Sequence, residues 1–164
     1  MLYRFVDERN FAARQMTFTK SFGYALRGVL YIALNSHDKP KQRVGEIASR
    51  LQVPKDFLGK IMKKLVQTGI LNSTKGPHGG FSLNNRTLCT SLLELATITN
   101  SISKVDDCVL RFDKCDSSHP CPLHHKMLHY RKDLYNLLAT TSIGELLNQG
   151  PADYIKSIHP SQAT

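Results

Sequence analysis

The sequence predicts a mainly α-helical fold with one small β-hairpin, and three patterns support this prediction. Apolar residues recur at spacings of three and four over several segments, as they do in amphipathic helices. A glycine-rich turn between two short alternating segments favours a hairpin. A long helical pattern then follows a cysteine-rich segment. At 164 residues the chain is long enough for one domain with its own core and an appended element.

The composition is that of a soluble globular protein, with 41% apolar and 21% charged residues. No stretch approaches the roughly 20 apolar residues that cross a bilayer, and the N-terminus lacks the apolar core of a signal peptide. We therefore expect no membrane association and a cytoplasmic location. Thiols stay reduced there, so clustered cysteines favour metal binding or redox chemistry over structural disulfides.

Positive charge is concentrated in the first half of the chain. Residues 1–86 contain 15 lysines and arginines against 5 acidic residues, whereas residues 87–164 contain 7 against 8. The net charge of +9 therefore belongs to the first half. A basic segment of a folded domain is typical of a polyanion-binding face, because phosphate contacts release condensed counterions. An ordinary solvated surface is the other interpretation of charge alone.

The first helical pattern covers residues 19–34, where Phe22, Ala25, Val29 and Ala33 share an apolar face. Residues 35–42 carry Asn, Ser, Asp and Pro and predict a loop. Residues 1–16 show no clean period, and we expect them to form an N-terminal extension.

Two further helical patterns, 44–51 and 54–68, are separated by a tight connection. Pro54 opens the second, a position where proline is well tolerated. The apolar residues that we expect the second helix to bury are Phe57, Leu58, Ile61, Met62 and Leu65. Its lysines, which we expect mostly on the remaining surface, are Lys55, Lys60, Lys63 and Lys64. A short helix, a tight turn and a longer lysine-bearing helix are the parts of a helix-turn-helix, whose second helix enters the major groove of DNA.

A glycine-rich hairpin follows directly, with strands predicted over 70–74 and 81–83 and a turn over 75–80. A hairpin in this position is a wing. Its tip contains Lys75, Gly76, His78 and Gly79, and we expect it to approach DNA closely because glycines leave no side chain in the way. A nucleotide-binding phosphate loop is the competing interpretation, but the required strand, Lys-Ser/Thr ending and helix do not occur in that order.

Three of the four cysteines and one histidine fall within residues 108–124, at the spacing Cys108-x6-Cys115-x5-Cys121-x2-His124. Thiolates suit iron in clusters or zinc, and an imidazole can complete a set of four ligands. The spacing lacks the Cys-x2-Cys knuckle of most structural zinc sites. It indicates an open loop that wraps something larger than one ion.

The remaining cysteine and the neighbouring histidines have other interpretations. Cys89 leads into a helix opened by the capping-box pattern Ser91-x-x-Glu94, and we expect it to be a buried structural thiol. His125 directly follows His124, so on a helix it points about 100° away. His119, inside the loop, is a minor competitor as a ligand.

Residues 122–139 carry an apolar stripe that is broad enough to need a partner. Its members are Leu123, Met127, Tyr130, Leu134, Leu137 and Leu138. The pattern Ser142-x-x-Glu145 predicts a short terminal helix over 142–147, and we expect residues 149–164 to form a flexible tail.

Five motifs together carry a resemblance to a known family. They are Ser21-Phe-Gly-Tyr-Ala-Leu-Arg27, Ile47-Ala-Ser-Arg-Leu51, Phe57-Leu-Gly-Lys-Ile61, Leu65 with Gly69, and Lys75-Gly-Pro-His-Gly-Gly-Phe81. Residues 17–147 resemble the winged-helix transcription regulators of the Rrf type, typified by IscR, the iron-sulfur cluster regulator, and NsrR, the nitric-oxide-sensing repressor. The most specific parts are the Gly-Pro-x-Gly-Gly-aromatic wing and the three-cysteine loop one helix later.

The resemblance implies a role for each site residue. Cys108, Cys115 and Cys121 match the three thiolate ligands of an iron-sulfur cluster, either 2Fe-2S or 4Fe-4S, and His124 matches the histidine that completes the set in the IscR branch. In the NsrR branch an acidic residue of the partner subunit can be the fourth ligand, and the matching position here is Gly23. Lys75 stands where these proteins often have an arginine. Preparation in air can leave the loop without its cluster.

The resemblance also implies how the chain is divided and assembled. The expected parts are an N-terminal extension (1–16), a winged helix-turn-helix domain (17–100), a cluster-binding loop (101–124), dimerisation and terminal helices (122–148) and a tail (149–164). The long helix would cross to a second subunit, and a two-fold dimer would fit palindromic half-sites of double-stranded operator DNA.

The sequence thus predicts a homodimeric DNA-binding regulator, expected to be a repressor, whose iron-sulfur cluster senses redox state, nitric oxide or cluster status. A zinc- or thiol-disulfide-based sensor on the same scaffold remains an alternative. An enzyme with a cysteine nucleophile is disfavoured, because no cysteine lies in a family-specific catalytic signature.

Overall fold

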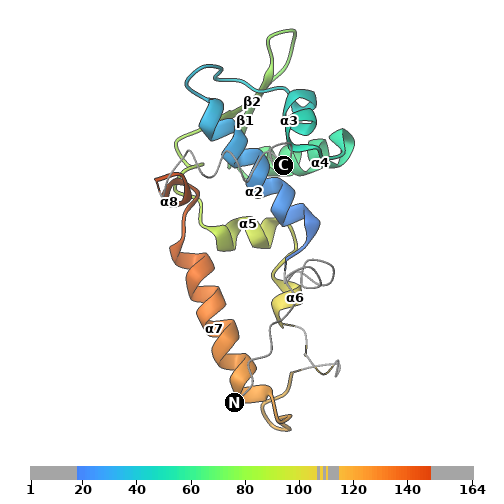
Figure 1. Cartoon of the computed structure of the whole chain (residues 1–164), viewed down its shortest axis with the longest axis vertical. Helices are drawn as coiled ribbons and strands as arrows, with labels where there is room; N and C mark the ends of the chain where they lie inside the picture. The colour runs from blue at the N-terminus through green and yellow to red at the C-terminus, as the bar shows by residue number, and fades with distance from the viewer. Residues whose placement is uncertain (1–17, 107, 109, 111–114, 149–164) are drawn as a thin grey trace, which may run out of the picture.

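The computed structural model describes residues 18–106, 108, 110 and 115–148. The described part is mostly helical with a two-stranded antiparallel hairpin, as the sequence predicts. The expected extension (1–16) and tail (149–164) lie outside the described residues. The hairpin lies at one end of the molecule, and a long helix extends from the other (Figure 1).

Helix α2 (Lys20–Asn35) is the centre of the hydrophobic core. It begins where the Thr19 hydroxyl oxygen accepts a hydrogen bond from the backbone N–H of Phe22 at 3.3 Å. Ala25, Val29 and Ile32 are fully buried along it. Burying side chains of the size of Val29 and Ile32 stabilises a fold by roughly 1.5–3 kcal/mol each, so this face holds the other helices in place.

The predicted helix-turn-helix is present as α3 (Val44–Leu51) and α4 (Lys55–Gln67), which pack against each other and against α2. Gln52 ends α3 in the left-handed conformation (φ 52°), and its N–H donates to the carbonyl oxygens of Ala48 and Ser49. Pro54 is the N-cap of α4. These caps turn the chain sharply within residues 52–54, so α4 packs on α3 through its buried face.

The hairpin consists of β1 (Leu71–Thr74) and β2 (Gly80–Leu83), paired in the register Leu71 with Leu83 and Thr74 with Gly80. Gln42 from the loop before α3 joins this hairpin, because its backbone N–H and carbonyl each bond to Phe81 at 2.9 Å. A Cβ on Gly80 would lie 2.7 Å from the Gln42 carbonyl oxygen. Glycine at this position therefore permits the close approach of the loop to the wing.

The second half of the chain forms α5 (Leu92–Ile98), α6 (Ser103–Asp106), α7 (His124–Thr140) and α8 (Ile143–Asn148). Both predicted capping residues act as such: Ser91 accepts from the N–H of Glu94, and Ser142 accepts from the N–H of Glu145. Ile143 and Gly144 donate backbone hydrogen bonds to Thr90 and Leu88, which fastens α8 to the segment before α5. The short helix α6 lies in the segment predicted as loop.

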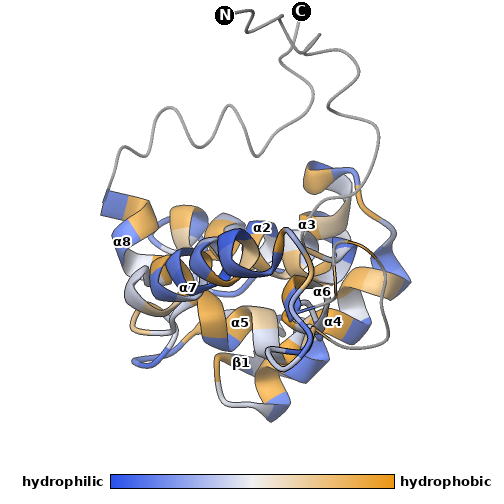
Figure 2. Cartoon of the chain, turned by 90° about the horizontal axis from the view of Figure 1, so that it is seen from below, coloured by the Kyte–Doolittle hydropathy of each residue, from blue (hydrophilic) through white to orange (hydrophobic). Residues whose placement is uncertain are grey.

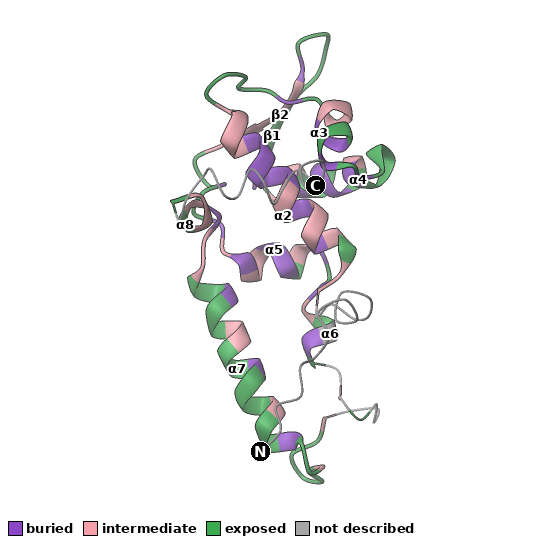
Figure 3. Cartoon of the chain, viewed as in Figure 1, coloured by how far each residue is buried: buried purple, intermediate pink, exposed green. Residues whose placement is uncertain are grey.

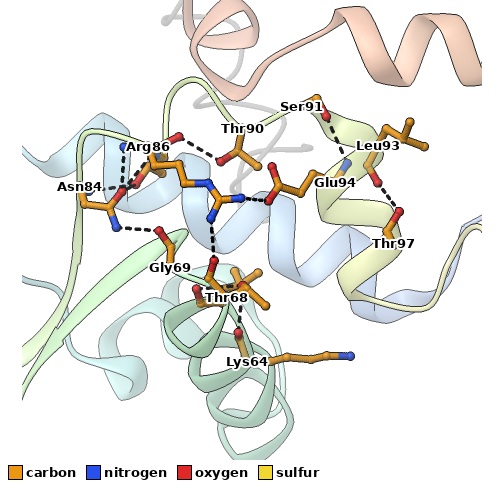
Figure 4. Close-up of polar contacts among 12 residues, drawn as sticks. Lys64, Thr68, Gly69, Asn84, Arg86, Thr90, Ser91, Leu93, Glu94 and Thr97 are labelled. Carbon is orange, nitrogen blue, oxygen red and sulfur yellow. Dashed lines mark hydrogen bonds and ion pairs between the residues drawn. The ribbon is translucent and has the colours of Figure 1, made fainter.

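Arg86 joins three parts of this scaffold, as Figure 4 shows. Its guanidinium donates to the carbonyl oxygen of Thr68, the C-cap of α4, at 3.0 Å, and forms an ion pair with Glu94 in the first turn of α5. Its backbone N–H donates to the Asn84 side chain at 2.9 Å, just after the wing. A cation at the C-terminal end of a helix also interacts favourably with the helix dipole. Arg86 therefore connects the second helix of the helix-turn-helix to α5.

Helix α7 is largely exposed along its length (Figure 3). His124, Arg131 and Leu138 are its buried residues. A view along the long axis of the molecule shows that the helices carry both hydrophobic and hydrophilic residues (Figure 2). Several large apolar side chains of α7 and the residue before it remain exposed, namely Leu123, Leu128, Tyr130 and Leu137.

Two expectations about burial are wrong. Phe57 is 41% exposed, because its ring lies on the rim of α4 and meets Tyr24 edge-on at 5.8 Å rather than entering the core. Cys89 is exposed rather than buried. Its neighbours Thr87 and Thr90 turn inward, and the Thr87 hydroxyl donates to the carbonyl oxygen of Ile70 at 2.6 Å. This arrangement leaves the Cys89 side chain facing solvent.

None of the helices within the described ranges is long and apolar enough to cross a membrane.

Candidate nucleic-acid interface and metal centre

The four lysines that the sequence places on the second helix of the helix-turn-helix are all exposed on α4: Lys55, Lys60, Lys63 and Lys64. The apolar residues Leu58, Ile61 and Leu65 on the opposite face are buried against α2 and α3. The amphipathic pattern therefore orients α4 with its cations outward. In Figure 4, Lys64 extends away from Arg86 and Glu94 into solvent.

At the wing tip, Lys75, Gly76 and His78 are exposed, and Gly79 is buried. Gly76 has φ 103°, a conformation that favours glycine. The N–H of Gly79 donates to the Gly76 carbonyl at 2.9 Å, which closes the turn. A Cβ on Gly79 would overlap the Thr74 carbonyl oxygen and lie 2.8 Å from the Lys75 carbonyl carbon. The glycines thus make a tight, narrow tip.

An open hollow of about 820 Å³ lies where the loop before α3, the start of α4 and the wing tip meet. We call it the basic hollow. Its lining includes Lys39, Lys41, Arg43, Lys55, Glu46 and His78. Of the predicted DNA-binding residues, the hollow brings together Lys55, His78 and Gly79; the remainder lie outside its lining.

Three cations of this hollow were not predicted as functional residues. Lys39, Lys41 and Arg43 belong to the segment before α3, for which the sequence pattern predicts only a connecting loop. The signal is visible in the sequence, since three basic residues fall within the five positions 39–43, directly ahead of the helix-turn-helix. Arg43 also donates a hydrogen bond from its guanidinium to the Pro77 carbonyl, which ties the wing tip to the N-cap of α3.

The cysteine-rich loop begins at a buried group of hydroxyls. Ser101 is fully buried, and its Oγ lies 2.5 Å from Thr19 Oγ1 and 3.2 Å from Thr99 Oγ1. These contacts hold the start of the loop against the N-cap of α2. Further along, the Tyr135 hydroxyl of α7 donates to Asp106 of α6 at 2.8 Å. Partial burial, followed by this bond, raises the pKa of Tyr135.

The end of the loop is the first turn of α7, where His124 is 3% exposed. Its Nδ1 lies 3.3 Å from the Sγ of Cys115, and its Nε2 lies 3.4 Å from the hydroxyl of Ser117. Its backbone N–H donates to the Cys121 carbonyl oxygen at 2.9 Å. The structure therefore brings the side chains of Cys115 and His124 together, and Cys121 is joined to His124 through its backbone carbonyl.

Cys108, Cys115 and Cys121 are free thiols that are partly exposed. Within the described part of the chain, no three His, Cys, Asp or Glu side chains are close enough to hold a metal ion. The donor set still fits an iron-sulfur cluster chemically, since it offers three thiols and an imidazole, one pair of which is already in contact.

The other histidines of this region have different partners. His119 pairs with Asp116 at 3.1 Å, and Asp116 also accepts the backbone N–H of Ser118 at 2.8 Å. The Ser118 bond first, and then the His119 contact, lower the pKa of Asp116. His125 is exposed and meets the ring of His124 edge-on at 5.4 Å. His119 and His125 thus take no part in the contact between Cys115 and His124.

The class of the chain follows from its similarity to a protein family. Residues 18–149 match the family model Rrf2, described as iron-dependent transcriptional regulator. The chain belongs to the Rrf2 family. It is 33% identical over 135 residues to a protein of Aquifex aeolicus assigned as an HTH-type transcriptional regulator, covering 81% of this chain and 92% of that one. It is 24% identical to the HTH-type transcriptional regulator IscR of Klebsiella pneumoniae strain 342, covering 81% and 80%.

Solved structures share the fold of this Rrf2 regulator. CymR, the global cysteine regulator of B. subtilis, superposes with a TM-score of 0.65 at 15% identity, over 83% of this chain and 99% of that one. T. potens IscR gives a TM-score of 0.61 at 15% identity, over 85% and 91%. The predicted family and winged-helix fold are thereby confirmed, and the protein is a transcriptional regulator of the Rrf2 family.

Proposed function

We propose that this Rrf2 regulator binds double-stranded operator DNA as a homodimer, and that an iron-sulfur cluster on Cys108, Cys115, Cys121 and His124 controls its affinity. The observation that carries the proposal is the contact of Cys115 with His124. A thiol and a buried imidazole in contact at the end of a three-cysteine loop are the start of a ligand set. The family description as iron-dependent supports iron as the metal.

For the DNA face we propose α4 and the wing. Exposed lysines on α4 and Lys75 on the wing would contact phosphates, which position the protein and dominate affinity. Helix α4 would enter the major groove, and the narrow glycine tip would reach the adjacent minor groove.

For the homodimer we propose α7 as the interface. Leu123, Tyr130 and Leu137 are exposed and recur at every seventh residue, the spacing of a helix-helix seam. Symmetric association through this seam would place two α4 helices for the two halves of a palindromic operator.

The cluster would act through the chain that holds it. A bound cluster would supply a centre that reacts with oxidants or nitric oxide. His124 is the first residue of α7, so tying it to the cysteines would fix the start of the dimer helix. The Tyr135 bond to Asp106 and the Ser101 bond to Thr19 join the same loop to α7 and α2. A change in the loop could thereby alter the spacing of the two α4 helices, with a coupling of about 1–3 kcal/mol, typical of allosteric proteins.

The test combines spectroscopy with DNA binding. The protein is purified without oxygen, and visible absorbance, electron paramagnetic resonance, iron and sulfide are measured. Operator affinity is then compared with and without the cluster by fluorescence anisotropy, in the natural chain and in the triple variant Cys108→Ala, Cys115→Ala, Cys121→Ala. Cys89→Ala is the matched control, because Cys89 is an exposed cysteine outside the loop.

We expect the triple variant to lack iron, sulfide and visible colour, while Cys89→Ala keeps them. Loss of the cluster should change operator affinity by roughly 5- to 150-fold, the range of that coupling energy. An affinity that is the same in the loaded, cluster-free and triple-variant proteins would refute cluster control, even if DNA binding itself remained.

A second candidate is a zinc- or thiol-based sensor on the same scaffold. It is favoured by the three partly exposed thiols and by the fact that only one thiol-imidazole contact is seen among the described residues. Three thiolates and an imidazole also suit tetrahedral zinc, and exposed thiols can form a reversible disulfide. A colourless anaerobic protein that contains one zinc per chain, or whose thiol titre falls by two on oxidation, would support this candidate.

A further inference from the structure

We propose that the basic hollow binds the sugar-phosphate backbone of the operator between the groove entered by α4 and the groove reached by the wing. This inference rests on the proposed DNA face and adds to it three residues, Lys39, Lys41 and Arg43.

The charge of the hollow fits a polyanion. Four basic side chains line it, namely Lys39, Lys41, Arg43 and Lys55, against the single carboxylate of Glu46. Lys39 forms an ion pair with Glu46, and this offsets the one charge that would repel a phosphate. A concave surface with an excess of one sign of charge focuses the field and raises the local concentration of its counterion.

The position of the hollow fits double-stranded DNA rather than a free anion. Lys55 is the first residue of α4, and His78 and Gly79 belong to the wing tip. A duplex that contacts both elements has to pass its backbone across the space between them. At about 820 Å³, the hollow exceeds a single phosphate and can accept a short stretch of backbone.

The start of α3 adds to the attraction. Val44 and Gly45, its first two residues, line the hollow. The N-cap Arg43 makes no side-chain capping bond to α3, because a guanidinium carries only donors; it donates to the Pro77 carbonyl instead. The uncapped N–H groups of a first helical turn, with the positive end of the helix dipole, attract phosphate oxygens.

Hydrogen bonds within the protein fix the shape of the hollow in the absence of DNA. Gln42 bonds through its backbone to Phe81 of β2, and its side-chain amide donates to the Lys39 carbonyl at 2.8 Å. Together with the bond from Arg43 to Pro77, these contacts fix the loop, the wing and α3 relative to one another. Arg43 is thus a positioning residue, and a preformed site loses less conformational entropy on binding.

Lys41 is the sharpest probe, because it is exposed and its substitution leaves the Arg43 and Lys39 contacts in place. The full-length variant Lys41→Gln is compared with Lys20→Gln, which removes the same charge from the exposed start of α2, outside the lining of the hollow. Circular dichroism verifies that both are folded. Fluorescence anisotropy measures their affinity for an operator duplex, selected by binding from a random library, and for an unrelated duplex, at several salt concentrations.

We expect Lys41→Gln to reduce the slope of log affinity against log salt by about one on both duplexes, because one phosphate contact is lost. Affinity should fall several-fold on each, with the ratio between them unchanged. Lys20→Gln should leave the slope as it is. Equal slopes for natural protein and Lys41→Gln, or a loss confined to the operator, would overturn the inference. If the natural protein itself fails to distinguish the two duplexes, the proposed operator binding is what fails.

Discussion

At the scale of single residues, two glycines in the first half of the chain differ in the space that is available for a side chain. A Cβ at Gly79 would meet the backbone of Thr74 and Lys75, whereas a Cβ at Gly23 of α2 has nothing within 4 Å. Backbone cannot move aside as a side chain can. The same added methyl group therefore strains the wing and fits on α2.

We expect Gly79→Ala to lower the free energy of unfolding by about 1–3 kcal/mol, the usual cost of overpacking. Gly23→Ala should raise it by about 0.5–1 kcal/mol, because alanine loses less backbone entropy than glycine in a helix interior. Urea denaturation followed by circular dichroism measures both. Two variants of equal stability would show that the wing tip can rearrange around a side chain.

Tyr135 gives a prediction about pH. Burial and the hydrogen bond to Asp106 raise the pKa of Tyr135, so the folded chain holds the phenol proton more tightly than the unfolded chain does. The stabilisation is fully present below the unfolded pKa of about 10 and is lost as the pH rises through the folded value. In Tyr135→Phe, the decline in unfolding free energy between pH 9 and pH 11 should be shallower than in the natural protein.

Tyr24→Phe is the matched control for this measurement, because Tyr24 lies on α2, outside both the bond to Asp106 and the proposed dimer seam. It should keep the natural decline. At pH 7, Tyr135→Phe should cost about 1 kcal/mol or less, as expected for one hydrogen bond on a partly exposed side chain. Indistinguishable pH profiles for both variants would contradict the prediction.

At the scale of elements, the wing is fixed to α3 by Arg43 as well as by its strand pairing. We expect the contribution of Lys75 to DNA affinity to depend on that attachment. In the background of Arg43→Ala, Lys75→Ala should therefore cost clearly less affinity than it does in the natural chain. A double-mutant cycle by fluorescence anisotropy should give a coupling of about 0.5–3 kcal/mol.

Lys63→Ala combined with Lys75→Ala provides the comparison for this cycle, because Lys63 lies on α4 outside the lining of the basic hollow. Those two effects should add within about 0.5 kcal/mol, as for independent sites. Additive effects of Arg43 and Lys75 would mean that the wing reaches DNA equally well without its attachment.

Most elements were predictable from the sequence because their signals are local. The bounds of α3 match the prediction, and α4 begins one residue after the proline that marks it. The helix α6 escaped prediction because four residues carry no period. Phe57 and Cys89 are apolar residue types, which favours the interior. In the structure, the ring of Phe57 packs against Tyr24 outside the core, and the threonines beside Cys89 turn inward in its place.

The candidate site was predictable in part for the same reason. Exposed lysines on α4 follow from the helical period, and the glycine tip follows from its motif. The contribution of residues 39–43 depends on pairing between Gln42 and Phe81, which are 39 positions apart, and no local pattern carries that contact. The contact of Cys115 with His124 likewise comes from the way the loop meets the first turn of α7.

At the scale of the whole molecule, several large apolar side chains of α7 are exposed and are not covered by the rest of the single chain. We expect Leu137→Asp, at a side chain that is 59% exposed, to convert the proposed dimer into a monomer. A charge buried in an apolar seam is costly unless it is paired. Light scattering after size-exclusion chromatography measures the mass, and operator affinity should fall because each half-site is then bound separately.

Asn136→Asp introduces the same charge one residue earlier, at an exposed polar position of α7 that points away from the seam. It should remain dimeric. A natural chain that is monomeric at micromolar concentration would refute the proposed assembly, and a dimeric Leu137→Asp would move the interface to another surface.

The attachment of α8 has a consequence for the order in which the chain folds. Ile143 is fully buried in the same cluster as the residues of α2, and its N–H bonds to Thr90, 53 positions earlier. During synthesis, the core around α2 therefore stays open on one side until α8 has left the ribosome. The winged-helix half cannot be completed before the cysteine loop and α7 exist, so a nascent chain reaches its final packing only together with its cysteine-rich segment.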